Sequence, residues 1–201
     1  MKDKKIGWIG TGLMGSPMAM HLVKAGYTLN VHTRSKSKAQ KHIESGCTWC
    51  DTTEELAANS DIIFTIIGMP EDVEEVYFGD NGILKTIKEH MVVVDMTTTK
   101  PSLAKRIFEA CKSKSATSVD APVSGGEVGA INGALSIMIG GEKQVVEDLM
   151  PIFDVFGKSM VYQGPAGAGQ HTKMCNQITI AGTMIGVCES LVYGAKAVGC
   201  L

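Results

Sequence analysis

The sequence predicts an α/β protein with a doubly wound, mostly parallel β-sheet, followed by one long helix at its carboxyl end. Short apolar runs alternate with segments of helical periodicity as far as residue 121, a pattern typical of strands joined by crossover helices. Residues 62–67 form a continuous apolar run, as expected of a parallel strand that is covered on both faces. A glycine-rich turn joins the first strand directly to the first helix.

This first unit carries the most specific signal. Residues 6–9 predict a buried strand and residues 14–23 a helix, and Gly10-x-Gly12-x-x-Gly15 lies between them. Gly10 permits the tight turn, Gly12 lets the backbone approach a pyrophosphate, and Gly15 lets helix and strand pack closely. The free N–H groups at the start of the helix favour an anion. Because strand, turn and helix follow without a gap, the motif predicts a Rossmann-type dinucleotide site rather than an unrelated glycine turn.

The next elements follow from apolar runs and helix signals. Acidic residues after Thr53 meet the positive end of a helix dipole, and Pro101 occupies a favoured first helical position. Strands are expected at residues 28–32, 47–49, 62–67, 91–94 and 118–121, and helices at residues 36–45, from residue 53, at 71–77 and at 101–111.

The pattern changes after Pro122. Residues 135–139 predict a strand reached through a glycine-rich stretch, without a clear crossover helix before it. We therefore expect some mixed-direction strand pairing in this region. A helix is expected at residues 142–153 and a short strand at residues 159–162.

Residues 170–198 contain no proline and only sparse charges. They predict a helix of roughly 40 Å. It is apolar on most sides and must therefore be buried on most sides. Polar residues such as Asn176 and Gln177 interrupt it, which argues against a membrane span. We expect it to pack against another domain or subunit, giving a homodimer or higher oligomer.

Composition restricts the class of protein. The chain has 201 residues, of which 44% are hydrophobic, enough for one large core. Its net charge of −2 gives no reason to expect nucleic acid or an anionic membrane as a partner. The first residues hold no long apolar signal region, so a cytoplasmic location is expected. The scattered cysteines predict reduced structural thiols, and Cys47-x-x-Cys50 lacks the second ligand pair of a metal site.

The residues after the second strand bear on the coenzyme. In NAD-binding proteins an acidic residue there holds the ribose 2′-hydroxyl. Here the position falls at Thr33, and residues 4–43 contain no acid. Thr33, Arg34 and Ser35 instead offer a guanidinium and two hydroxyls, which suit a 2′-phosphate. The sequence predicts NADP(H) in preference to NAD, unless these basic residues form only a solvated surface.

Four motifs in order resemble the β-hydroxyacid dehydrogenase family. That family includes 3-hydroxyisobutyrate dehydrogenases and the tartronate, succinic and glyoxylic semialdehyde reductases, and it is related to 6-phosphogluconate dehydrogenase. The motifs are Gly10-Thr-Gly-Leu-Met-Gly-Ser-Pro-Met, Asp95-Met-Thr-Thr-Thr-Lys-Pro101, Asp120-Ala-Pro-Val-Ser-Gly-Gly-Glu-Val-Gly-Ala130 and Gly167-Ala-Gly-Gln-His-Thr-Lys-Met-Cys-Asn-Gln177. Together they span nearly the whole chain, and the third and fourth are specific to the family.

The resemblance implies a role for residues of each motif. Lys173 is implied to be the catalytic acid/base and Asn176 to help position the substrate. Ser124, Gly125 and Gly126 are implied to bind the substrate carboxylate. The coenzyme contacts predicted from the turn, from the second strand and from the resemblance are Gly10, Thr11, Gly12, Leu13, Met14, Gly15, Thr33, Arg34, Ser35, Met69, Pro70, Glu74 and Thr98.

The residues themselves agree with these roles. Ser124 and the two glycines after it offer a hydroxyl and bare N–H groups, which suit a carboxylate but also fit an ordinary turn. Lys173 lies early in a largely apolar helix, so it is either snorkelling or functional, and burial would lower its pKa. Asn176 lies on the same helix face. His21 and His42 read as helix-surface residues.

The sequence therefore predicts an oxidoreductase that transfers a hydride between NADP(H) and a small 3-hydroxy acid or semialdehyde acid. Residues 1–165 are expected to form the NADP-binding Rossmann domain, and residues 166–201 the long interdomain helix. The family carries an all-helical domain after this helix, which this sequence lacks, so a non-catalytic NADP-binding dimerisation module is the alternative. A decarboxylating phosphogluconate-type enzyme is less favoured, because residues 124–133 contain no Lys or Arg.

Overall fold

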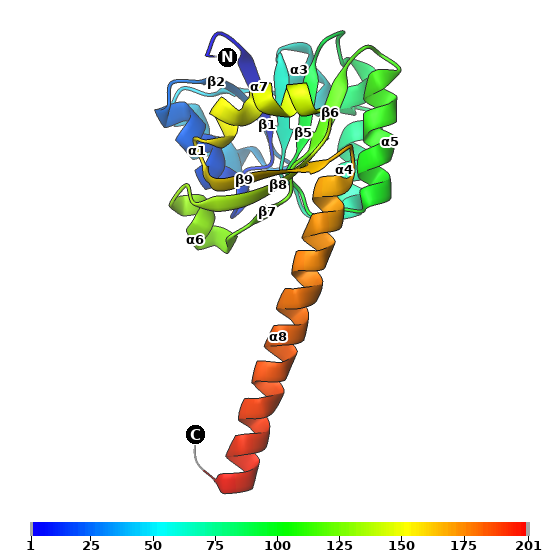
Figure 1. Cartoon of the computed structure of the whole chain (residues 1–201). Helices are drawn as coiled ribbons and strands as arrows, with labels where there is room; N and C mark the ends of the chain where they lie inside the picture. Colours follow the sequence, from blue (N-terminus) through cyan, green and yellow to red (C-terminus); the bar gives the residue numbers. More distant parts are fainter. Residues whose placement is uncertain (1, 200–201) are drawn as a thin grey trace.

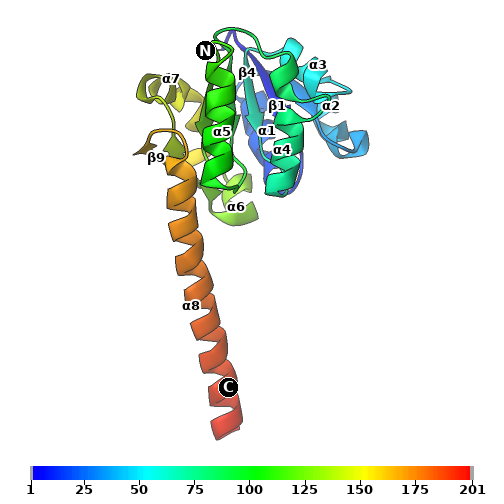
Figure 2. The same cartoon turned by 90° about the vertical axis from the view of Figure 1, so that its right-hand side faces the viewer.

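The computed structural model describes residues 2–199, which form a nine-stranded sheet flanked by helices and one helix that projects from it (Figures 1 and 2). The strands are β1 (Lys5–Ile9), β2 (Thr28–His32), β3 (Thr48–Trp49), β4 (Ile62–Thr65), β5 (Val92–Asp95), β6 (Thr117–Asp120), β7 (Val123–Ser124), β8 (Leu135–Gly140) and β9 (Gly157–Gly164). The helices are α1 (Gly15–Lys24), α2 (Gln40–Glu44), α3 (Thr53–Ala58), α4 (Pro70–Phe78), α5 (Pro101–Lys112), α6 (Gly126–Ile131), α7 (Lys143–Phe153) and α8 (Ala168–Val198), with short 3-10 turns at Lys36–Ala39 and Ile83–Lys85.

The strand order is β3-β2-β1-β4-β5-β6-β8-β7, with β9 beside β8. The chain runs outward from β1 through β2 to β3 and then returns to the other side of β1 to begin β4. Strands β1 to β6 are all parallel, which confirms the doubly wound sheet. The order reverses between β1 and β4, so the crevice for a ligand is expected there, at the carboxyl ends of the strands.

The mixed-direction pairing expected after residue 121 is also confirmed. Strand β8 runs antiparallel to β6 and β7 and parallel to β9. The glycine-rich stretch before β8 was expected only as a connection, yet it contains β7 and α6. Ser124 pairs with Ser136 across the sheet, so long-range pairing, rather than local propensity, sets the structure of this stretch.

The apolar run of β4 is buried because helices cover both faces of the sheet. Phe64 faces the layer of α1 and α7, where it stacks on Trp8 at 5.6 Å between ring centroids and meets Phe153 edge-on. Ile63 faces the other layer, where it belongs to the cluster that contains Leu56 of α3. Burial of each such large side chain contributes about 1.5–3 kcal/mol, so these rings hold the carboxyl ends of β1 and β4 in place.

The two histidines expected on helix surfaces differ from that expectation. His42 is fully buried, because α2 packs against α1 and His42 Nε2 lies 3.2 Å from the carbonyl oxygen of Ser16. Burial lowers the pKa of His42. His21 is half-buried, and its Nε2 lies 3.1 Å from the carbonyl oxygen of Ala130 and 3.0 Å from that of Ile131. It therefore ties α1 to α6.

The described cysteines are unpaired thiols. Cys47 and Cys50 are buried, and burial raises the pKa of each to about 11. Both thiols are therefore protonated at neutral pH and pack as small apolar groups.

Helix α8 begins against the sheet and then projects away from the rest of the chain (Figure 1). Its buried residues are Gly169, Gln170 and Lys173, all in the first two turns. Farther along, apolar side chains lie in solvent, such as Ile178 at 73% exposure. By length and composition alone the helix could cross a membrane, and no residue of its apolar 18-residue window is buried in this structure.

Candidate coenzyme and substrate site

The three glycines of the first turn have different surroundings. Gly10 has φ +102°, and a Cβ there would lie 2.1 Å from the carbonyl oxygen of Ile66. A Cβ on Gly15 would lie 2.1 Å from the carbonyl oxygen of Gly10. Around Gly12, by contrast, a Cβ would meet no atom within 4 Å. Gly10 and Gly15 are thus required by close backbone contacts, to Ile66 after β4 and within the turn respectively, whereas Gly12 faces open space that a ligand can enter.

The amino end of α1 presents backbone donors to the same space. The helix begins at Gly15, and no side chain caps its first turn. Uncapped N–H groups at a helix start favour a phosphate. Thr11 is buried, and its Oγ1 has no hydrogen-bond partner among the described residues. These features fit the pyrophosphate of a dinucleotide.

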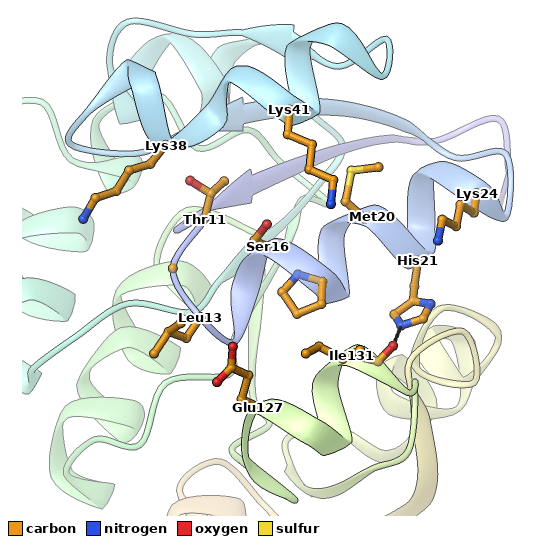
Figure 3. Close-up of a pocket in the computed structure, with 12 residues that line it drawn as sticks. Thr11, Leu13, Ser16, Met20, His21, Lys24, Lys38, Lys41, Glu127 and Ile131 are labelled. Atoms are coloured by element: carbon orange, nitrogen blue, oxygen red, sulfur yellow. Dashed lines mark hydrogen bonds between the residues drawn. The ribbon is translucent and has the colours of Figure 1, made fainter.

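A cavity of about 670 Å³ begins at this turn and follows the outer side of α1 (Figure 3). Thr11, Leu13 and Ser16 lie at one end of it. Lys41 points toward it, Lys38 lies at its edge, and Glu127 lies on the opposite side (Figure 3). Both lysines belong to the helical segment that follows β2.

Arg34, just after β2, makes a contact that the sequence did not suggest. Its Nη1 lies 3.2 Å from Oδ1 of Asp72 in α4. The other carboxylate oxygen of Asp72 accepts a hydrogen bond from the N–H of Met69 at 2.9 Å. Because β1 lies between β2 and β4, this ion pair joins the chain on one side of the glycine turn to the chain on the other. An acid therefore does face the predicted 2′-phosphate site, from a distant part of the sequence.

The other predicted coenzyme contacts follow β4 and β5. Met69 is 63% exposed and Pro70 opens α4. Thr98 is exposed in the loop after β5. Glu74 forms an ion pair with Arg106 of α5, which occupies its carboxylate on the outer surface of these helices. Met69, Pro70 and Thr98 lie at the carboxyl ends of adjacent strands, as their predicted role requires.

The residues expected to bind a carboxylate form the turn between β7 and α6. Ser124 is half-buried, and Gly125 and Gly126 are exposed. Both glycines have positive φ, +132° and +61°. The turn is therefore exposed and built on backbone conformations that favour glycine, which suits a carboxylate ligand.

Lys173 and Asn176 occupy the second and third turns of α8. The Lys173 side chain is only 7% exposed, and burial lowers its pKa. Asn176 is half-buried, and its Oδ1 is buried with no hydrogen-bond partner in the described part of the chain. Because buried polar groups are normally paired, this oxygen marks a place where a ligand donor fits. The two side chains lie on one face of α8.

Two residues of the site were missed by sequence reasoning. Asp120 ends β6 and accepts hydrogen bonds from the N–H groups of Gly167 at 2.7 Å and Gln170 at 2.8 Å. Its neighbour in register is Asp95 of β5. Burial raises the pKa of each carboxyl to about 6. The sequence did contain one signal for Asp120. It is an acidic residue at the end of a predicted strand, and a glycine-rich helix start follows later in the chain.

Comparison with known proteins agrees with this architecture. A family model described as the NAD binding domain of 6-phosphogluconate dehydrogenase matches residues 5–164. An uncharacterized oxidoreductase, YkwC, of Bacillus subtilis is 54% identical over 194 residues, covering 96% of this chain and 67% of its own. A probable 3-hydroxyisobutyrate dehydrogenase-like protein of Arabidopsis thaliana is 49% identical over 196 residues, covering 97% of this chain and 58% of its own.

A solved structure gives the same result. The 3-hydroxyisobutyrate dehydrogenase of Mycobacterium tuberculosis with L-serine superposes with a TM-score of 0.89 at 28% identity, over 98% of this chain and 66% of that one. The chain thus spans 58% to 67% of the length of these three proteins. With the glycine turn, the strand order and the four motifs in place, the chain belongs to the β-hydroxyacid dehydrogenase family and contains its NAD(P)-binding domain.

Proposed function

We propose that the protein transfers a hydride between NADP(H) and a small 3-hydroxy acid or the corresponding semialdehyde acid, with Lys173 as general acid/base. The observation that carries this proposal is the burial of Lys173 in the second turn of α8, which lowers the pKa of its amine. A catalytic proton carrier works best when its pKa lies near the working pH, and burial moves lysine in that direction. Relatives named 3-hydroxyisobutyrate dehydrogenase-like protein and 2-hydroxy-3-oxopropionate reductase support the substrate class.

In this reaction each of the site residues has a separate chemical role. NADPH, when bound, supplies the hydride. The ammonium of Lys173 donates a proton to the oxygen of the substrate carbonyl as that oxygen becomes an alkoxide. In the oxidative direction the neutral amine accepts the hydroxyl proton. Asn176 orients the substrate through its unpaired amide oxygen, which can accept a hydrogen bond, and the turn at Ser124 binds the carboxylate.

A substrate panel tests the function. Succinic semialdehyde, glyoxylate, tartronate semialdehyde and methylmalonate semialdehyde are each incubated with the full-length protein and either coenzyme. We expect NADPH-dependent turnover of at least one compound. If the protein binds NADPH but reduces none of them, the alternative of a non-catalytic NADP-binding dimerisation module is favoured instead.

The Arg34–Asp72 contact gives a prediction about the coenzyme. Asp72→Asn keeps an oxygen to cap the N–H of Met69 but removes the charge that competes for Arg34. We expect it to tighten NADPH binding about 2- to 5-fold and to leave NADH binding nearly unchanged, since an exposed ion pair contributes about 0.2–1 kcal/mol. Arg34→Ala should weaken NADPH binding about 10-fold or more, since a charge-assisted contact to a phosphate contributes about 1.5–3 kcal/mol. Both are measured by coenzyme titration.

A matched control removes a charge from the same helix turn. Glu71 of α4 faces Lys100 instead of Arg34, with 3.8 Å between the charged atoms. Glu71→Gln should therefore leave the ratio of NADPH to NADH affinity unchanged. A ratio that moves equally in Glu71→Gln and Asp72→Asn would show a general charge effect and contradict the specific role of Asp72.

We also propose that α8 is covered by protein in a dimer or higher oligomer. Met184 and Leu191 are 55% and 50% exposed on its outer part, which is a large apolar surface for a soluble chain. Light scattering should give a mass of at least two chains, and the double substitution Met184→Lys with Leu191→Lys should lower it. A wild-type monomer, or wild-type protein that co-floats with lipid vesicles, would contradict this proposal.

A further inference from the structure

The side chain of Gln170 joins two parts of the site that are far apart in sequence. It is fully buried in the first turn of α8. Its Nε2 donates to the carbonyl oxygen of Thr97 at 2.6 Å, and its Oε1 accepts from the N–H of Thr99 at 3.0 Å. A buried amide is costly unless it is paired, and here one amide meets both an acceptor and a donor of the same loop.

The start of α8 is held from a second side as well. Asp120 accepts from the N–H groups of Gly167 and Gln170, so the end of β6 fixes the same helical turn. The approach is close, because a Cβ on Gly169 would lie 2.5 Å from the carbonyl oxygen of Met138. The first turn of α8 is therefore fixed between the end of β6 and the loop after β5.

Both segments that Gln170 joins, the loop after β5 and the first turns of α8, contain a predicted functional residue. Thr98 lies between the two loop residues that Gln170 binds and is exposed at the predicted coenzyme contact. Lys173 follows Gln170 by three positions, so the two side chains are neighbours on one face of α8. Both are buried. A rotation of this helix face would displace the amine relative to the loop.

We propose that Gln170 is a positioning residue that sets the location of the Lys173 amine relative to the coenzyme loop of residues 97–99. This inference rests on the proposed function. Gln170 is fully buried, so it acts through the backbone of the loop and through the helix turn that it shares with Lys173, not by direct contact with a ligand. Loss of its two side-chain hydrogen bonds should slow the chemical step more than it weakens binding.

Gln170→Met tests this directly, because methionine has a similar length but cannot make either hydrogen bond. We expect kcat to fall about 10- to 100-fold, since small displacements of catalytic groups have effects of that size, while KM and the NADPH dissociation constant change less than about threefold. The matched control is Gln163→Met. Gln163 also contacts α8, by accepting a hydrogen bond from the hydroxyl of Thr172 at 3.2 Å, and within residues 2–199 it makes no side-chain hydrogen bond to the coenzyme loop. Its kcat should stay near the wild-type value, and equal losses in the two variants would overturn the proposal.

Gln170→Glu provides a readout that a purely structural role would not give. An ionised glutamate accepts from Thr99 but cannot donate to the carbonyl of Thr97, whereas a protonated glutamate can do both. Its kcat, expressed relative to wild type at each pH, should therefore recover as the pH falls. Asp95, Asp120 and Lys173 titrate in both proteins, so the ratio removes the part of their titrations that the two proteins share. A ratio that stays well below one and does not rise as the pH falls would overturn the proposal.

Failure of the proposed function can be distinguished from failure of the inference about Gln170. If the wild-type protein binds NADPH without turnover, the coupling is measured instead by hydrogen exchange at residues 168–173. NADPH should then slow exchange there in wild type and in Gln163→Met, but less in Gln170→Met. Equal protection in all three proteins would overturn the coupling itself.

Discussion

Lys173→Met is expected to lower kcat by about 10²- to 10⁴-fold, the range typical of a lost general acid/base. Methionine fills a similar volume in the apolar surroundings of the buried lysine but carries no proton at neutral pH. The glycine turn and the loop of residues 97–99 remain intact, so NADPH affinity should change little. Steady-state kinetics and coenzyme titration of the full-length protein measure the two quantities separately. Near-normal turnover in this variant would remove Lys173 from the mechanism.

The same substitution should raise stability at neutral pH. Burial lowers the pKa of Lys173, so the folded state disfavours its charged form relative to the unfolded state. That cost is fully present below the folded pKa and is relieved as the pH rises through it toward the unfolded value. Lys173→Met should therefore have a higher Tm than wild type at pH 7, and the difference should shrink at alkaline pH. Lys196→Met, at an exposed position on the same helix, serves as the control and should show no such gain.

The pH dependence of turnover gives an independent check of the same assignment. Carbonyl reduction needs the ammonium form of Lys173. The kcat of reduction should therefore fall as the pH rises through the lowered pKa of this amine. Hydroxy-acid oxidation needs the neutral amine and should rise over the same interval. Profiles that move in the same direction would contradict a single acid/base at this position.

The sheet was predictable because its signals are local. Each central strand is a short apolar run covered on both faces, and the turn after β1 shows its spaced glycines within six residues, although Gly10 also packs against the distant Ile66. The structure of residues 123–131 was not predictable in this way. Glycines there favour a turn, and only pairing of Ser124 with Ser136 of β8 makes the strand.

The missed polar contacts have a common cause. Arg34 meets Asp72 across 38 positions of sequence, and Asp120 meets Gln170 across 50. Neither pair leaves a periodic pattern, because each joins the end of a strand to a distant helix, α4 or α8, that it meets only in the folded protein. His42 was misjudged for a related reason, since its burial depends on how α2 packs against α1. The sequence indicated which segments form the site, but tertiary packing determines which side chains meet there.

Alanine substitutions in the glycine turn should affect folding and coenzyme binding separately, because each adds one methyl group at a different place. Gly15→Ala should destabilise the protein by about 1–3 kcal/mol or more, as expected of overpacking, because its Cβ would lie 2.1 Å from the backbone oxygen of Gly10. Gly12→Ala meets open space and should leave the free energy of unfolding within about 0.5 kcal/mol of wild type. Denaturant titration of the two variants measures this contrast.

Gly12→Ala, which should leave stability nearly unchanged, should weaken coenzyme binding. The space that a methyl group would enter there is the space through which a pyrophosphate approaches the main chain. Gly12→Ala should therefore weaken NADPH and NADH binding alike, by about 10-fold or more, which corresponds to about 1.4 kcal/mol. Gly182→Ala, at an open position of α8, should change neither affinity. Wild-type coenzyme affinity in Gly12→Ala would mean that the diphosphate does not lie against this turn, and the assignment of the coenzyme site would then fail while the fold stood.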